Sequence, residues 1–431
     1  MFLVSLVFLC CADLFFAVRI HNYNFRIGQL FLLAALLPLL YKYLAQPLSV
    51  IFNSNPNLRI LLNWIPFFLI YAITAIISPN QSPTLIKLAW AVFNIGGAAL
   101  LFLGLQPWGS LKKAVLYGMG AVAFFICLEF IVLYFFGGLS WFNFLETHSP
   151  ADTPWFRNLL GYAQIAPQYE NTQIFRPHAF YYEPSYAGCA LTFAFPLSIA
   201  ICFEKNKQNF RSIVIPALIF CAIIITTSRS AVLGIFIGCS CIFIATLITK
   251  RMELFKYFVK IISIGLLFLV LSASFPLVQK YGGFFANILN PHLISERAQD
   301  PQSSEGWRVA NTSKGIETSE KHPWLGIGVP PLSADRGLNG LGQTNQSMWV
   351  EVLIESGTLG FLAFLFGLGK SLYDAVGRKN DLSFVILIFA AIIPHFSVSM
   401  NFTSTFPRLD YWLLFFFAVR MALENQKENS K

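Results

Sequence analysis

The chain has 431 residues, of which 56% are hydrophobic and only 12% are charged. This composition, a mean hydropathy of +0.62 and apolar segments of nearly membrane-spanning length exclude an ordinary soluble domain and predict an all-α, multi-pass membrane protein. The formal net charge of +9 does not indicate nucleic-acid binding, because basic cytoplasmic loops account for a positive charge in a membrane protein.

Twelve apolar segments predict transmembrane helices along the whole chain, which we interpret as a single integral membrane domain (1–431). The first segment lacks a basic start and a small-residue cleavage site, and Asp13 interrupts it. We therefore expect a retained span rather than a signal peptide. The predicted spans cover residues 1–18, 28–43, 58–78, 85–105, 113–137, 181–203, 212–227, 230–248, 257–275, 347–369, 382–400 and 406–421.

The distribution of Lys and Arg predicts how these spans are oriented. With both termini in the cytoplasm, every inner segment is basic, and the outer segment that contains Arg19 and Arg26 is the one short exception. Two long polar loops, about 138–180 and 276–346, then lie on the outer side. We expect them to form partly ordered caps over a cavity.

Metal and cofactor sites are not predicted. The eight cysteines all fall in or beside apolar runs, which indicates small buried side chains rather than disulfides or metal ligands in the loops. Motifs for phosphate loops, dinucleotides and zinc are missing from the sequence, and its acidic residues do not have the spacing of metal ligands.

The stretch TQIFRPHAFYYEPSYAG, residues 172–188, places Arg176, His178 and Glu183 directly before an apolar span. Ionisable residues at a membrane boundary usually mark a site, because hydrocarbon solvates them poorly. Glu183 has two interpretations: it caps the following helix and pairs with Arg176, or it is a general base beside a phosphate-binding arginine. His178, Tyr181 and Tyr182 are candidate substrate contacts.

A second candidate is Arg229, in the stretch ITTSRSAVLG between two spans, with Ser228 and Ser230 beside it. An arginine on the outer side could extend toward lipid headgroups. Alternatively, it is a buried cation whose planar guanidinium binds phosphate oxygens.

The third candidate stretch is GWRVANTSKGIETSEKHPWLGIG, residues 306–328. Its part VANTSKGIETS predicts an amphipathic helix on the membrane surface, and the HPWLGIG turn then returns the chain to the core. Arg308 and His322 are either solvated loop residues or substrate contacts.

The fourth stretch, residues 343–364, reads QTNQSMWVEVLIESGTLGFLAF. Glu351 and Glu355 are four residues apart and share one helix face. They either pair with Arg229 or Arg308 or take part in catalysis, and we expect the structural role. Gln346 and Glu351 are candidate substrate contacts.

Together, RPHAFYYEPSYAG, TTSRSAVLG, GWR followed by HPWLGIG, and NQSMWVEVLIESGTLG resemble the O-antigen ligase and O-antigen polymerase (Wzy-type) superfamily of bacterial surface polysaccharide enzymes. The motifs cover about 170–365, and the twelve-span layout extends the resemblance over the chain. The resemblance implies a GT-C-like, metal-independent, inverting glycosyltransferase of the bacterial inner membrane. It implies that Arg176, Arg229 and Arg308 bind the diphosphate of an undecaprenyl-diphosphate-linked glycan at the periplasmic face.

One departure favours the polymerase branch. Ligases carry a His-Asn pair about eleven residues before the glycine of the E-x-G turn, where this chain has Gln346 and Ser347 before Gly357. Gln cannot act as a base, so Glu183 becomes the preferred base, with His178 and His322 as alternatives. Lipid-linked oligosaccharides would then be both donor and acceptor.

Membrane lipids and a chain-length regulator protein would be further partners. Two alternatives to the polymerase stay open. One is a ligase that transfers the finished glycan to lipid A-core or to protein, and the other is a secondary transporter with paired broken helices.

Overall fold

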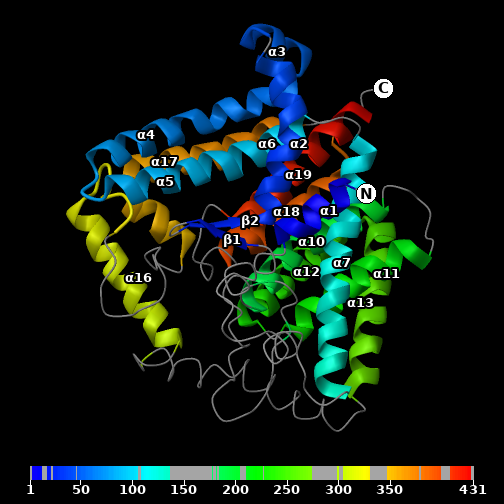
Figure 1. The fold of residues 1–431 in the computed structure, drawn as a ribbon. Coiled ribbons are helices and arrows are strands. Elements are labelled where there is room, and N and C mark those ends of the chain that lie inside the picture. The colour runs from blue at the N-terminus through cyan, green and yellow to red at the C-terminus, as the bar shows by residue number, and fades with distance from the viewer. Residues whose placement is uncertain are drawn as a thin grey trace.

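The computed structural model describes most of the helical part of the chain. The described residues are 2–11, 17–20, 23–44, 46–104, 108–135, 177, 181, 184–203, 210–226, 228–273, 299, 304–330, 347–377, 380–398 and 408–428. Within them the fold is helical apart from one short hairpin (Figure 1). Of the two predicted outer loops, 138–180 lies outside the described residues except for Pro177, and 276–346 is described over 304–330 and at 299.

Each predicted span overlaps at least one described helix. The 3-10 helix η1 continues directly into α4, and α5 continues through the π-helical segment η2 into α6. The helices are α1 (Phe2–Cys11), α2 (Ile27–Leu44), α3 (Leu48–Ser54), η1 (Pro56–Trp64), α4 (Ile65–Ile77), α5 (Gln81–Ala91), η2 (Val92–Gly96), α6 (Gly97–Gly104), α7 (Trp108–Phe135), α10 (Pro184–Phe203), α11 (Phe210–Ile225), α12 (Arg229–Ile248), α13 (Met252–Ala273), α16 (Ser304–Lys321), α17 (Met348–Ala375), α18 (Leu382–Ser397) and α19 (Leu409–Glu428).

Six helical segments of the described chain are long and apolar enough to cross a membrane, which fits a multi-pass membrane protein. They are Pro56–Ile77, Gln81–Gly104, Trp108–Ile131, Ser185–Phe203, Arg229–Ile248 and Met348–Ala375. Three shorter apolar helices cover Gly28–Tyr43, Ser212–Ile225 and Leu382–Ser397. The total of twelve spans stays a prediction.

The first predicted span, 1–18, is wrong at its end, where Ala17 and Val18 belong to a strand. Helix α1 ends at Cys11, and strands β1 (Ala17–Ile20) and β2 (Tyr23–Arg26) pair as an antiparallel hairpin. Apolar and polar residues alternate along β2, which is the period of a strand rather than of a helix. Apart from this hairpin, the described residues form helices, as the sequence predicts.

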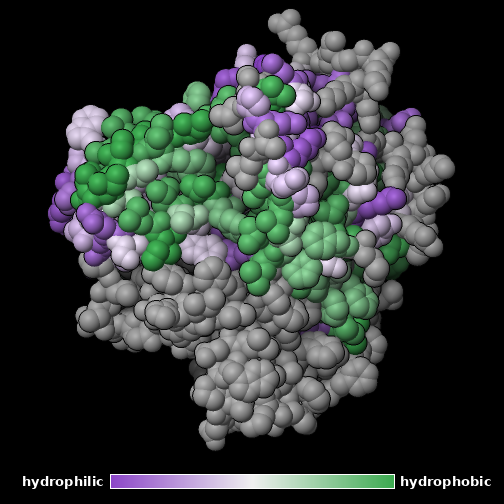
Figure 2. All heavy atoms as spheres, turned by 45° about the horizontal axis from the view of Figure 1, so that its top comes forward, coloured by the Kyte–Doolittle hydropathy of each residue, from purple (hydrophilic) through white to green (hydrophobic). Residues whose placement is uncertain are grey.

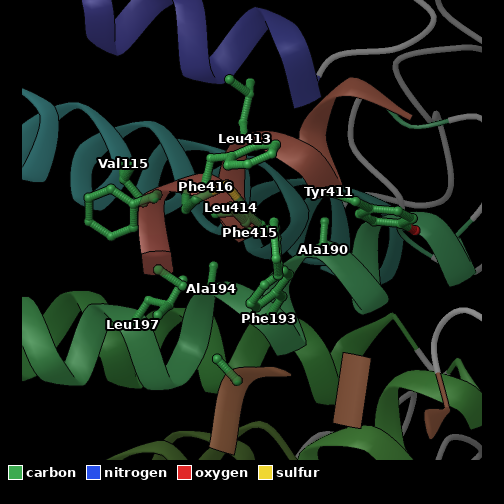
Figure 3. Close-up of a cluster of buried hydrophobic side chains, with 14 of the residues drawn as sticks. Val115, Ala190, Phe193, Ala194, Leu197, Tyr411, Leu413, Leu414, Phe415 and Phe416 are labelled. Atoms are coloured by element: carbon green, nitrogen blue, oxygen red, sulfur yellow. The ribbon is translucent and has the colours of Figure 1, made fainter. Parts of the chain in front are cut away.

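Helix α10 lies at the centre of the main bundle, where 89% of its apolar window is buried. It packs against α7, α11, α12, α18 and α19. Small residues allow this close packing: a Cβ atom on Gly188 would lie 2.5 Å from Cβ of Ala231 and 2.8 Å from Oγ1 of Thr226. Figure 3 shows Phe193 and Leu197 of α10 meeting Leu414 and Phe415 of α19 in the apolar core.

Helices α4, α5 and α17 form a second group, which lies side by side in the upper left of Figure 1. Aromatic side chains join it to α19, since the Trp64 ring meets the rings of Phe364 and Trp412 at 5.7 and 5.2 Å. On the outside of this group, Figure 2 shows a broad apolar surface bordered by hydrophilic residues. Lipid contact accounts for such a surface, since exposed apolar residues such as Leu69, Ile73 and Ile76 of α4 contribute to it.

Helix α17 is broken at Gly357, whose φ of 65° and ψ of −174° lie outside the helical region. The break frees backbone groups on both sides of Gly357, and the turn 322–330 that follows α16 bonds to them. The bonds run from the N–H groups of Thr358 and Leu359 to the carbonyls of Pro323 and Trp324, and from the N–H groups of Ile327 and Gly328 to the carbonyls of Ile354 and Glu355, at 2.7 to 3.2 Å.

The tip between α4 and α5 holds the other side of this turn. Side chains of α4, α5 and the segment between them hydrogen-bond the turn backbone at 2.6 to 3.0 Å. Thr74, Ser78 and Asn80 donate to the carbonyls of Leu325, Ile327 and Val329, and Thr84 accepts from the N–H of Val329. The turn is therefore fixed between the α4–α5 tip and the break in α17.

Gly357→Ala should lower the stability of the protein. The backbone conformation of Gly357 strongly disfavours a side chain, and an added Cβ would lie 2.3 Å from the Trp324 carbonyl oxygen. We expect a loss of at least about 1–3 kcal/mol from the backbone conformation, increased by this overlap. Gly369→Ala in the same helix is the matched control, because a Cβ there has no neighbour within 4 Å. Thermal unfolding in detergent measures both, and equal midpoints would contradict the structural role of Gly357.

Candidate functional site

A buried cluster of ionisable side chains joins α4, α5 and α17. Lys87 of α5 contacts Oε1 of Glu351 and, at 2.5 Å, Oε1 of Glu355, while the Tyr71 hydroxyl donates to Oε2 of Glu355 at 2.7 Å. The side chains of Glu351 and Glu355 are 0% and 1% exposed, and that of Lys87 is 15% exposed. Three charged side chains buried in a membrane protein indicate either a functional site or an ion cluster that stabilises the fold.

The local sequence explains this arrangement. Glu351 lies in the first turn of α17 and Glu355 lies four residues later, so both side chains point to the same side of the short helical stretch before Gly357. Glu355 is only two residues before the break, and its carbonyl is bound by the turn 322–330. The break therefore fixes the backbone that carries the carboxylates.

Glu351 and Glu355 share one helix face, as their spacing predicts, and both contact Lys87. The expected partners were Arg229 or Arg308, whereas the structure places Lys87 and Tyr71 against the carboxylates. The sequence did contain a signal, because Lys87 is the single charged residue of the predicted span 85–105. An ionisable residue inside such a span needs a partner.

A second group of polar residues gathers where α10 and α19 begin. Arg408 is 2% exposed, and its Nε and Nη2 atoms donate to the two Asp410 carboxylate oxygens at 3.2 and 3.1 Å. Its guanidinium carbon lies 4.4, 5.0 and 5.7 Å from the ring centres of Tyr186, Tyr411 and Tyr181. Through its ion pair with Asp410 and its contacts with the three rings, Arg408 joins the start of α19 to Tyr181, a predicted substrate contact.

Arg229 is the first residue of α12 and is half-buried. Ser228 caps this helix by accepting from the N–H of Ala231 at 3.4 Å, and it also lies 3.0 Å from the Ser230 hydroxyl. Ser230 lies 3.4 Å from Cys189 of α10. The structure thus brings the TTSRSAVLG stretch against the start of α10, whose first five residues are the end of the RPHAFYYEPSYAG motif. A cation at a helix N-terminus suits an anionic ligand.

Several of the predicted site residues are not among the residues that the structure describes. Arg176, His178, Tyr182, Glu183 and Gln346 lie outside the described residues.

Arg308 and His322 lie near opposite ends of α16. Arg308 is the fifth residue of the helix, although its side chain is not described, and the exposed His322 follows the last residue. They are fourteen positions apart along the chain, which corresponds to about 21 Å along a helix. One diphosphate group therefore cannot contact both.

The predicted amphipathic helix VANTSKGIETS forms part of α16. Val309 and Ile316, seven residues apart and 52% and 44% exposed, provide its outward apolar side. Lys321 donates to Glu317 at 2.8 Å, which lowers the pKa of this exposed carboxyl. The position of α16 on the membrane surface stays a prediction.

Within the described part of the chain, His, Cys, Asp and Glu side chains do not come together in groups that could hold a metal ion.

Residues 214–365 match the family model described as O-antigen ligase (Wzy_C). This match confirms the resemblance to the O-antigen ligase and polymerase superfamily. It covers the chain from α11 to the middle of α17 and includes Arg229, Arg308 and both glutamates of the buried cluster. The family match does not separate the ligase branch from the polymerase branch. A comparison with curated proteins finds no match.

Lys87→Met should destabilise the protein, because it leaves two buried carboxylates without the ammonium group that contacts both. Removing one partner of a buried charge pair costs about 3–5 kcal/mol. Lys370→Met is the matched control, because Lys370 pairs with Asp374 at a site where the side chains are 39% and 30% exposed, and such pairs contribute less than about 1 kcal/mol. Thermal unfolding midpoints measure both variants.

The triple variant Lys87→Met, Glu351→Gln, Glu355→Gln distinguishes charge from packing. If uncompensated charge causes the loss, neutralising both carboxylates should recover part of the stability. A triple variant less stable than Lys87→Met alone would contradict this account.

Proposed function

We propose that the protein joins oligosaccharide repeat units carried on undecaprenyl diphosphate, at the outer face of the inner membrane. The observation that carries this proposal is the match to the O-antigen ligase family over a stretch that positions Arg229 at the start of α12, against the start of α10. A guanidinium at a helix N-terminus is suited to a phosphate group.

In the proposed reaction, a sugar hydroxyl of one lipid-linked unit attacks the anomeric carbon of the glycan on another. A carbon–oxygen bond forms, the bond from the anomeric carbon to the phosphate oxygen breaks, and its electron pair leaves with undecaprenyl diphosphate. Fixed cations stabilise the charge that develops on the diphosphate, so a divalent metal is not required. Arg229 supplies one of these cations, and Arg176 and Arg308 are the other candidates.

The buried cluster of Lys87, Glu351 and Glu355 has a positioning role in this proposal. It holds the first turns of α17 against α5, and this stretch of α17 directly follows the second outer loop. Because Lys87 contacts both carboxylates, it fixes where the loop re-enters the bundle. A precise re-entry point matters, since a small displacement of a reacting group costs a large factor in rate.

A ligase is the second candidate, because the matching family model carries the description O-antigen ligase. Gln346 and Ser347 favour the polymerase, because Gln cannot accept a proton as the ligase His does. Deleting the gene separates the two. Loss of a polymerase leaves single repeat units on the final acceptor, whereas loss of a ligase leaves lipid-linked polymer that is not transferred.

The break in α17 beside buried charges is also a feature of secondary transporters, in which broken helices occur in pairs. Within the described helices, Gly357 is the one residue whose backbone angles are not helical. Movement of a lipid-linked glycan across liposome membranes without glycan joining would favour the transporter.

Arg229→Ala and Arg176→Ala should each shorten or abolish the glycan ladder on a gel. Losing one fixed donor to the developing charge should lower the rate by about 10²–10³-fold. Glu183→Gln should have a similar effect if Glu183 is the base. Arg251→Ala is the control, because Arg251 is 45% exposed and pairs only with a partly exposed Asp381 among the described residues. Normal ladders from both arginine variants would reject the assignment.

Chelation tests the expectation that the reaction does not require a metal. Purified protein with lipid-linked repeat units should keep its activity in EDTA, because arginines rather than a divalent ion neutralise the leaving group. Activity that disappears in EDTA and returns with added Mg²⁺ would contradict this mechanism.

A further inference from the structure

Two adjacent polar side chains in the core of the bundle have unused hydrogen-bonding groups. His395 of α18 is 0% exposed, and neither ring nitrogen has a hydrogen-bond partner among the described residues. The hydroxyl of Tyr411 of α19 is also buried without a partner in this part of the chain. The two rings meet edge to face with centres 4.8 Å apart. Unsatisfied buried polar groups are rare and call for an explanation.

Packing does not explain the histidine. Its ring stacks on Phe193 of α10 at 4.4 Å and meets Phe396 at 5.1 Å, so it occupies a position inside an aromatic cluster. A phenylalanine would make the same ring contacts without burying two nitrogen atoms. The imidazole therefore costs folding free energy at this position.

Both side chains lie close to the ends of their helices. His395 is two residues before the end of α18 at Ser397, and Tyr411 is in the first turn of α19, which begins at Leu409. Figure 3 shows the Tyr411 oxygen pointing away from the cluster of apolar side chains. Only terminal turns therefore separate this pair from the segment that joins α18 to α19.

The same position adjoins the arginine and tyrosine group described above. Arg408 lies over the Tyr411 ring at 5.0 Å and over Tyr181 of the predicted substrate motif at 5.7 Å. The pair of His395 and Tyr411 is thus connected, through Arg408, to the start of α10, against which the stretch that contains Arg229 lies.

We propose that His395 and Tyr411 bind the attacking hydroxyl of the acceptor sugar and that His395 takes its proton. A neutral imidazole offers one acceptor nitrogen, and a phenol can donate, so a sugar hydroxyl can donate to His395 and accept from Tyr411. This inference rests on the proposed function and assigns the role of base to His395 in place of Glu183, which lies outside the described residues.

The step balances without a further reactant. The hydroxyl proton moves to the His395 ring as the acceptor oxygen bonds to the anomeric carbon, and the electron pair of the broken bond leaves on the diphosphate. The imidazolium then returns its proton to water before the next turnover. Histidine can take this role because a neutral imidazole has one ring nitrogen that can accept a proton.

The experiment compares three variants of the full chain, purified in detergent and supplied with lipid-linked repeat units. His395→Phe keeps the ring contacts and removes both nitrogens, so its unfolding midpoint should equal or exceed that of the wild type while kcat falls by about 10²–10⁴-fold. His395→Gln keeps a donor and an acceptor but is not a base. It should keep KM within about threefold while kcat falls. Phe389→Leu, on the 37% exposed side of α18, is the control and should retain wild-type kcat.

A His395→Phe variant that is folded and has wild-type kcat would overturn the proposal. If His395→Phe does not fold, Tyr411→Phe decides, because it removes one buried oxygen only. It should lower kcat/KM by about tenfold, and unchanged kinetics would overturn the proposal. Wild-type protein that joins no glycans would overturn the proposed function together with this inference, whereas active wild type with active variants overturns the role of His395 alone.

Discussion

The α4–α5–α17 group depends on the backbone hydrogen bonds that join the turn 322–330 to the residues on both sides of Gly357. A helix inside a bilayer must satisfy its own N–H and C=O groups, because hydrocarbon offers no partner. The break in α17 frees such groups, and the turn binds them from both sides of Gly357. Non-helical backbone at membrane depth is tolerated here because protein covers it.

These backbone hydrogen bonds also explain why charged residues can be buried beside them. Glu351 and Glu355 lie on the short helical stretch before the break, where the turn fixes the backbone and Lys87 and Tyr71 reach across from α5 and α4. Each buried charge is therefore compensated by a group whose own helix is attached to the same turn. Loosening any one of these contacts exposes an uncompensated charge, which couples α4, α5, α16 and α17 into one unit.

Much of the helical arrangement could be predicted from the sequence, because a helix that crosses a membrane must be apolar over the thickness of the hydrocarbon layer. The helix face shared by Glu351 and Glu355 follows equally from the helical repeat. The partner of these glutamates could not be predicted, because Lys87 is 264 residues from Glu351 and no local pattern links them. The hairpin at 17–26 was missed because the alternation of apolar and polar residues is short and comes soon after an apolar run. Arg408 and Asp410 were missed because two charges at the start of a span resemble an ordinary interface anchor.

Two of the buried polar groups, the Lys87 cluster and the pair of His395 and Tyr411, differ in a way that bears on function. The Lys87 group has donors and acceptors facing one another, so it stabilises the fold and positions the loop re-entry. His395 and Tyr411 instead face each other without a hydrogen bond, and stability alone would favour a phenylalanine at the histidine position. Residues that weaken the fold are expected at functional sites, because a polar group without a hydrogen-bond partner in the protein is available to a substrate. By this criterion the chemistry belongs at the junction of α10, α18 and α19, and the ion cluster on α17 belongs to its support.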